Sequence, residues 1–309
     1  MRKDTTVKLG ISKPENIKET EETLSEPRCY GLSDIGKVRG NNEDSFAIVA
    51  KRGYCIFGVF DGMGGMERGE VASSIAKEEL IKHANQSEIA DEKVLNEIFE
   101  RANEKIYSYS KERGIEGKMG TTGVIAIVKN GTLYYGNVGD SRLYVLRDGK
   151  LIKATHDHTL VAMQVEQGII SKKDAEKSKL KNILTKAIGV KSTVQPEFYA
   201  PMKLKEGDTV LLCSDGLYNM ANEKEIVKVL SGALTLKEKA EKLIKIANKH
   251  GGKDNITVVI YENKNKKSVR KSKKAFLYIT LLIIAAIATV LFVIYKPLIM
   301  KFIGTVVRK

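Results

Sequence analysis

The chain has 309 residues, of which 42% are hydrophobic and 29% are charged, with only 5 prolines. This composition is typical of a globular protein and excludes a mainly disordered, collagen-like or disulfide-scaffold chain. The formal net charge is +14, but 11 of the 52 basic residues and none of the 38 acidic residues lie between Lys264 and the C-terminus. The first 263 residues therefore carry 41 basic and 38 acidic side chains, so the excess charge belongs to a tail and no nucleic-acid-binding domain is expected.

The three cysteines, Cys29, Cys55 and Cys213, show no metal-finger spacing. Cys55 and Cys213 lie in apolar runs, which indicates small buried core residues in a reducing compartment. None of the three lies in a phosphate-cradling loop, so a cysteine nucleophile is not expected.

The predicted elements begin after residues 1–28, a polar stretch without sustained periodicity that we interpret as a flexible N-terminal extension. The expected strands are Ser45–Val49, Tyr54–Phe60, Thr122–Val128, Thr132–Asn137, Arg142–Leu146, Leu151–Ala154, Thr209–Cys213 and Ile256–Tyr261. The expected helices are Glu67–His83, Glu92–Lys111, Glu223–Leu230 and Leu236–Lys249. Asn130-Gly131 and Asp148-Gly149 predict two tight hairpins, so neighbouring strands should be antiparallel. Helices between runs of strands favour packing on the outside of one or two sheets.

The C-terminal part of the chain has a different composition. Residues 263–274 contain seven basic side chains, and residues 275–295 form a run of 21 without any charge. At about 1.5 Å per residue this run spans roughly 30 Å, so it predicts a single transmembrane helix. The basic flank predicts that the preceding domain faces the cytoplasm and that residues 296–309 form a short extracytoplasmic tail. The same flank should contact anionic lipid headgroups.

Five short acidic motifs stand beside glycines or at the ends of predicted strands. They are Arg39-Gly-Asn-Asn-Glu43-Asp44, Phe60-Asp61-Gly62, Gly139-Asp140-Ser-Arg142, Ser214-Asp215-Gly216 and Lys253-Asp254-Asn255. A single Asp-Gly after a strand is usually only a turn. Five such sites that converged would repel one another, because few cations accompany them. Hard divalent cations relieve that repulsion, and an all-oxygen donor set favours Mg²⁺ or Mn²⁺ over Zn²⁺.

The ordered set of motifs resembles the metal-dependent Ser/Thr protein phosphatases (type 2C, PPM), especially their compact bacterial branch. The resemblance runs from about Tyr30 to Glu262, roughly three quarters of the chain. Further motifs that carry it are Met119-Gly-Thr-Thr122, Thr155-His-Asp157-His158, Leu184-Thr-Lys-Ala-Ile-Gly189 and Gly252-Lys-Asp254-Asn-Ile-Thr257. Each motif alone is weak, whereas eight in the family order are specific.

The resemblance implies an α+β fold over residues 29–262, in which two antiparallel β-sheets pack face to face and are flanked by helices as an α-β-β-α sandwich. It also implies a dimetal site in the cleft at one end of the sheets. Asp61 would bridge two Mn²⁺ or Mg²⁺ ions, and the carbonyl of Gly62 would bind the first ion. Asp215 and Asp254 would bind the second.

Further roles follow from the same resemblance. Glu43 and Asp44 would act on metal-bound waters or as outer ligands, and Asp140 would help to bind a third, weaker ion. Arg39 is the candidate for bidentate phosphate contact. Met63 stands where some relatives have a histidine, so the general acid is left unassigned.

These residues predict a protein serine/threonine phosphatase in which two cations about 3.5–4 Å apart lower the pKa of a bridging water, which then attacks phosphorus. The expected partners are phosphoproteins and a cognate Ser/Thr protein kinase, and the catalytic domain should be monomeric. The alternative is a non-catalytic module of the same fold that binds phosphoproteins. Loss of a metal-ligating acid would favour that alternative, but Asp61, Asp215 and Asp254 are all present. Residues 161–181 correspond to the family's variable flap beside the cleft, and we expect them to influence substrate choice.

Overall fold

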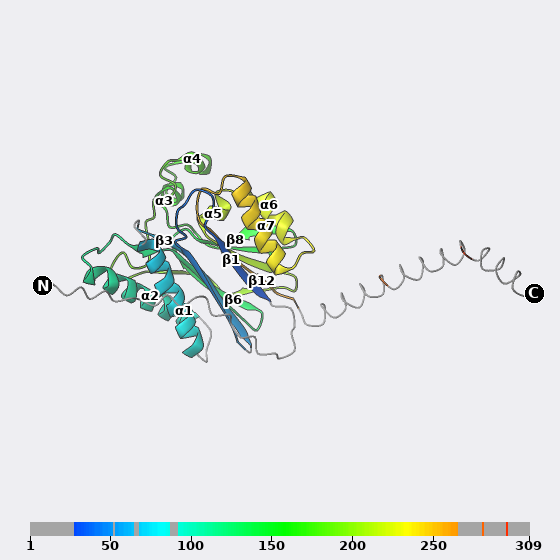
Figure 1. Cartoon of the computed structure of the whole chain (residues 1–309), viewed down its shortest axis with the longest axis horizontal. Coiled ribbons are helices and arrows are strands. Elements are labelled where there is room, and N and C mark those ends of the chain that lie inside the picture. The colour runs from blue at the N-terminus through cyan, green and yellow to red at the C-terminus, as the bar shows by residue number, and fades with distance from the viewer. Residues whose placement is uncertain are drawn as a thin grey trace, which may run out of the picture.

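Two antiparallel β-sheets form the centre of the protein (Figure 1). The computed structural model describes residues 28–51, 53–64, 68–86 and 92–264, with the single positions 280 and 295. The first sheet has the strand order β1-β12-β11-β7-β8. Its strands are β1 (Cys29–Asp34), β7 (Arg142–Arg147), β8 (Lys150–Lys153), β11 (Thr209–Cys213) and β12 (Ile256–Glu262). The second sheet has the order β10-β6-β5-β3-β2, with β4 beside β3 and β9 beside β6. Its strands are β2 (Asp44–Lys51), β3 (Tyr54–Met63), β4 (Gly120–Thr121), β5 (Gly123–Lys129), β6 (Thr132–Val138), β9 (Glu197–Phe198) and β10 (Met202–Lys203).

Helices cover the outer face of each sheet, which confirms the predicted α-β-β-α arrangement (Figure 1). The helices on the second sheet are α1 (Arg68–Gln86) and α2 (Glu92–Glu112). Those on the first sheet are α5 (Asp215–Tyr218), α6 (Glu223–Leu230) and α7 (Leu236–Lys249). A small pair, α3 (Leu160–Glu166) and α4 (Lys172–Lys177), stands apart from both layers.

Strand β3 shows why the sequence of the central strands is uniformly apolar. Its Ile56 and Phe60 belong to the core under α1 and α2, whereas Phe57 and Val59 belong to the core between the sheets. The Phe57 ring stacks on Tyr261 of the opposite sheet with centroids 5.8 Å apart. Because both faces of the sheet are covered, both sets of alternating side chains are apolar.

The two predicted hairpins are confirmed. Asn130 and Gly131 have φ of 51° and 72°, and Asp148 and Gly149 have φ of 49° and 74°. Two consecutive positive φ values are what a tight two-residue turn needs to match the twist of its strands, and Asn-Gly and Asp-Gly adopt them readily. These turns set the registers of β5 with β6 and of β7 with β8.

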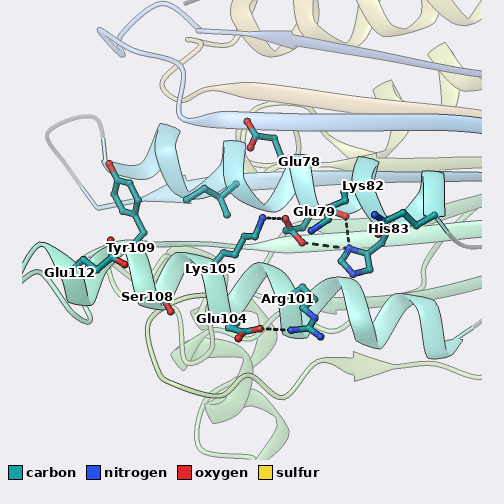
Figure 2. Close-up of a pocket in the computed structure, with 12 residues that line it drawn as sticks. Glu78, Glu79, Lys82, His83, Arg101, Glu104, Lys105, Ser108, Tyr109 and Glu112 are labelled. Carbon is teal, nitrogen blue, oxygen red and sulfur yellow. Dashed lines mark hydrogen bonds and ion pairs between the residues drawn. The ribbon is translucent and has the colours of Figure 1, made fainter. Parts of the chain in front are cut away.

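A groove of about 760 Å³ runs between α1 and α2, away from the acidic motifs (Figure 2). Glu79 of α1 is buried beneath it and forms an ion pair with Lys105 of α2. The Glu79 carboxylate also lies 3.6 Å from Nδ1 of His83, which is hydrogen-bonded at 3.0 Å to the Glu79 carbonyl oxygen. The ion pair between Glu79 and Lys105 ties the two helices together, so we interpret this groove as structural.

Lys105→Met should destabilise the domain by about 1–3 kcal/mol, because it leaves the Glu79 carboxylate buried without its cation. The Lys105 side chain is 52% exposed, which keeps the expected cost at the low end for a buried pair. Denaturant unfolding measures the change. Lys82→Met, an exposed lysine on the same groove, is the matched control and should stay within about 0.5 kcal/mol of the wild type.

The predicted membrane location is corrected by the structure. No helix in the part of the chain that the structure describes is both long and apolar enough to cross a membrane. The longest of these helices, α1 and α2, carry charged side chains along their length, and hydrocarbon accommodates such side chains only at high cost. The predictions for the two ends of the chain fall outside the described residues, apart from the few described positions within them: the extension 1–28, the basic stretch 263–274, the span 275–295 and the tail 296–309.

Candidate active site

Strands β2 and β3 bring two carboxylates together at one end of the second sheet, where β2 begins and β3 finishes. Asp44 and Asp61 are directly paired in the antiparallel register. Asp61 is held at its backbone: its N–H donates to Thr122 Oγ1 at 3.0 Å, and its carbonyl accepts from the Thr122 N–H at 2.8 Å. Glu43, one residue before β2, accepts a hydrogen bond from the Gly62 N–H at its carbonyl oxygen, 3.1 Å away.

Gly62 is a position where no side chain fits. A Cβ there would lie 2.1 Å from the carbonyl oxygen of Gly69 and 2.5 Å from that of Glu43. The start of α1 therefore packs directly on the Asp61-Gly62 backbone. This close packing fixes the carbonyl and the carboxylate at the end of β3.

Three more carboxylates lie at the same end of the sandwich: Asp215 and Asp254 adjoin strands of the first sheet, and Asp140 lies in the connection from β6 of the second sheet to β7 of the first. Asp215 begins α5 directly after β11, and its Oδ2 accepts a hydrogen bond from Asn219 Nδ2 at 3.0 Å. Asp254 precedes β12, and Asp140 follows β6. The buried Asp140 carboxylate accepts a weak hydrogen bond from the Tyr218 hydroxyl at 3.3 Å.

These acidic groups from the two sheets surround one cavity of about 670 Å³. The acidic residues that line it are Glu43, Asp61, Asp140, Asp215 and Asp254. Arg39, Gly62 and Met63 also line it, and Asn182 and Leu184 contribute from the segment after α4. Asp44 is buried and is not among the residues that line the cavity.

The carboxylates raise one another's pKa. Burial contributes most to the raised pKa of Asp61, and the charges that raise it further are those of Asp44, Asp215, Asp140 and Asp254. Burial also raises the pKa of Asp215, and among the neighbouring charges that of Asp140 raises it most. The pKa of Asp44 and that of Asp140 rise to about 6, again chiefly through burial. So much negative charge in one buried place is unfavourable unless cations bind there.

The residues present fit hard divalent cations. Asp44 Oδ1 is buried and has no hydrogen-bond partner, while Asp44 Oδ2 accepts from the Ser214 hydroxyl at 2.7 Å. The donors around the cavity are oxygens, which suits Mn²⁺ or Mg²⁺. Within the described residues, no three His, Cys, Asp or Glu side chains close around a single point at ligand distance. The carboxylates thus surround a shared space instead of forming a compact one-ion cage.

Arg39 lies at the rim of the cavity and is bound to Asp254. Its Nη2 donates to Asp254 Oδ2 at 2.9 Å, and its Nε lies 2.9 Å from Oδ1. The hydrogen bond to Asp254 raises the pKa of Arg39, so the guanidinium stays charged. Half of the Arg39 side chain is exposed.

Several residues that hold the acidic motifs stand inside the quoted motifs but were given no role from the sequence. Asn255 Oδ1 accepts from the Glu43 N–H at 2.9 Å, and Ser214 holds Asp44 as described above. His158 supports the Asp140 turn, because its Nδ1 accepts from the Gly139 N–H at 3.1 Å and its Nε2 donates to Glu197 Oε2 at 2.8 Å. The signal in the sequence was their membership of these motifs, which does not tell a supporting residue from a ligand.

An end-of-sandwich cavity lined by acidic residues from both sheets, with an arginine at its rim, is the arrangement of a metal-dependent hydrolase that acts on an anionic substrate. Comparison with known proteins gives the family. The family model described as "Protein phosphatase 2C" matches residues 30–256. The chain belongs to this family.

Curated relatives and solved structures agree with this membership. The serine/threonine phosphatase stp of Listeria monocytogenes is 39% identical over 237 residues, which cover 74% of this chain and 93% of the relative. The protein phosphatase PhpP of Streptococcus pneumoniae is 35% identical over 234 residues, 74% of this chain and 94% of the relative. The serine/threonine phosphatase of S. agalactiae superposes with a TM-score of 0.71 at 32% identity and covers 76% of this chain and 98% of its own. The catalytic domain of the phosphatase PstP, solved in complex with two manganese ions, gives a TM-score of 0.69 at 32% identity over 77% of this chain and 98% of its own. The protein is thus a metal-dependent serine/threonine phosphatase that uses Mn²⁺ or Mg²⁺.

Proposed function

We propose that Asp61, Gly62, Asp215 and Asp254 hold two divalent cations in the acidic cavity and that the protein removes phosphate from phosphoserine and phosphothreonine in proteins. The observation that carries this proposal is the convergence of carboxylates from both sheets on one cavity beside an exposed arginine. The two cations supply a water of lowered pKa as the nucleophile and neutralise charge on the transferred phosphoryl group.

The chain's own residues position the reaction. The antiparallel pairing with Asp44 fixes the position of Asp61, and the absence of a side chain at Gly62 lets Gly69 and Glu43 pack directly on the backbone that lines the cavity. Glu43 lines the cavity and Asp44 lies behind it, so both can orient waters as hydrogen-bond acceptors. Asp140, which also lines the cavity, is suited to a third and weaker ion.

Arg39 is the proposed phosphate contact. A planar guanidinium can bind two phosphate oxygens at once, and half of the Arg39 side chain is open to solvent at the cavity. Among the described residues that line the cavity there is no histidine, and Met63 stands at the position where some relatives have one. We therefore assign protonation of the leaving oxygen to solvent in the cavity and not to a side chain.

The reaction class also defines a biological counterpart. Phosphoserine and phosphothreonine in proteins are products of Ser/Thr protein kinases, so we propose that the phosphatase opposes such a kinase. Quantitative phosphoproteomics with and without the protein should show phosphoserine and phosphothreonine peptides accumulating in its absence. Phosphotyrosine peptides should not change.

The direct test uses the purified full chain with a phosphothreonine peptide and Mn²⁺, and measures released phosphate. Excess EDTA should lower the rate by more than about 100-fold, because the carboxylates alone offer no nucleophile activation. Addition of Mn²⁺ should restore it. Equal rates with and without EDTA would exclude the metal-dependent mechanism.

A further inference from the structure

The segment between β8 and β9 borders the acidic cavity. It contains α3 and α4, which project from the two-sheet body next to α5 (Figure 1). Its returning end places Asn182 and Leu184 in the cavity lining. Backbone hydrogen bonds close the base of the segment: the Leu160 N–H donates to Ile183 O at 2.8 Å, and the Thr185 N–H donates to His158 O at 2.9 Å.

One side chain of this segment reaches the body of the domain beside the cavity. Lys181 Nζ donates to Asn219 Oδ1 at 2.9 Å. The Asn219 amide then donates from Nδ2 to Asp215 Oδ2 at 3.0 Å. Among the side chains of residues 160–184 that the structure describes, Lys181 alone forms a hydrogen bond with another part of the domain. Two consecutive hydrogen bonds therefore connect the segment to an acidic residue of the cavity.

The chemistry of the connection fixes its direction. An ammonium group is only a donor and a carboxylate is only an acceptor, so the amide between them must present its oxygen to Lys181 and its nitrogen to Asp215. Asn219 also lies one turn after Asp215, with its N–H bonded to the Asp215 carbonyl at 2.9 Å. The amide thus binds one oxygen of the Asp215 carboxylate, and this contact limits the rotation of a side chain that lines the cavity.

We propose that Lys181 and Asn219 form a latch that holds the 160–184 segment against the cavity, and that Asn219 also orients the Asp215 carboxylate. Both are positioning residues, since neither lines the cavity itself. This proposal rests on the proposed role of Asp215 as a metal ligand. Lys181 then determines how a protein substrate fits under the segment, whereas Asn219 affects both the segment and the ion site.

The first test needs neither metal nor activity. Hydrogen exchange of residues 178–184, measured in EDTA on the full chain, should become about 5–10-fold faster in Lys181→Met and in Asn219→Leu, as expected for loss of a charge-assisted hydrogen bond. Lys181→Arg keeps a donor and should restore slow exchange. Lys179→Met removes an exposed lysine of the same segment and should leave exchange unchanged. Exchange in Lys181→Met equal to that in Lys179→Met would overturn the latch.

The second test separates the two residues. Asn219→Leu should weaken Mn²⁺ binding, measured by titration calorimetry, by about 10–100-fold, because it removes a hydrogen bond that orients a ligand. Lys181→Met should not weaken Mn²⁺ binding, because it removes only a nearby cation. It should instead raise the KM for a phosphothreonine peptide about fivefold and leave hydrolysis of p-nitrophenyl phosphate within about twofold of the wild type. Unchanged Mn²⁺ affinity in Asn219→Leu would overturn the orienting role. If the wild type hydrolysed no phosphopeptide, the proposed function would fail, while the exchange results would still decide the latch.

Discussion

Asp61→Asn should lower phosphopeptide hydrolysis at saturating Mn²⁺ by more than about 100-fold, since even residues one layer outside a metal site cost 10–100-fold in affinity or activity when they are replaced. Asp61 lies near the end of β3, and burial together with the charges of four other acidic residues raises its pKa. An amide keeps the shape of the side chain but cannot supply a charged oxygen to two cations. The measurement is the steady-state rate on a phosphothreonine peptide over a range of Mn²⁺ concentrations.

For the same variant we expect a gain in metal-free stability alongside the loss of activity. Without metal, Asn at this position relieves the like-charge repulsion, so the melting temperature in EDTA at pH 8 should rise by a few °C. Loss of activity together with a gain in metal-free stability distinguishes loss of a ligand from misfolding. Asp148→Asn is the matched control, because Asp148 is 80% exposed in a hairpin turn whose positive φ asparagine also adopts. It should change neither quantity, and an active Asp61→Asn enzyme would contradict the assignment.

The regular part of the fold could be predicted from the sequence because local signals agree with the tertiary packing. The helices Glu223–Leu230 and Leu236–Lys249 match their predicted bounds, since Asn222 and Thr235 begin them with capping boxes that can be recognised in the sequence. Strand β1 was not predicted. It is six residues long with Gly31 inside it, and that glycine is required because a Cβ would lie 2.4 Å from the ring of Phe46. Such close contact between distant segments leaves no local pattern.

The acidic residues of the site could be predicted from their motifs, although their individual roles stay predictions. What the sequence could not provide is how they are supported. Ser214 and Asp44 are hydrogen-bonded across 170 positions, and Asn255 holds Glu43 across 212. The pairing of Arg39 with Asp254 was also unexpected, because the two lie 215 positions apart. The motifs in the sequence identify the carboxylates of the site. The packing of the two sheets determines which hydrogen-bond donors reach those carboxylates.

The stabilisation of the domain by Mn²⁺ should depend strongly on pH. The pKa of Asp44 and that of Asp140 are raised to about 6 from an ordinary value of 3.8, chiefly by burial. A raised carboxylate pKa in the folded state means that protonation favours folding. This contribution is complete below about pH 4 and is lost as the pH rises through 6. Metal-free protein at pH 8 therefore bears the full repulsion of the cluster, which Mn²⁺ relieves, whereas at pH 5 protons compete with the ions for the same oxygens.

At a free Mn²⁺ concentration about 100 times the dissociation constant measured at pH 8, binding adds about 2.7 kcal/mol, or a melting temperature about 5–10 °C higher than in EDTA. Scanning calorimetry at pH 8 and pH 5 with the same free Mn²⁺ should show this gap shrinking by more than half at the lower pH. In Asp61→Asn the gap should be small at both values, so a wild-type gap that did not change with pH would show that the ions bind elsewhere than among these carboxylates.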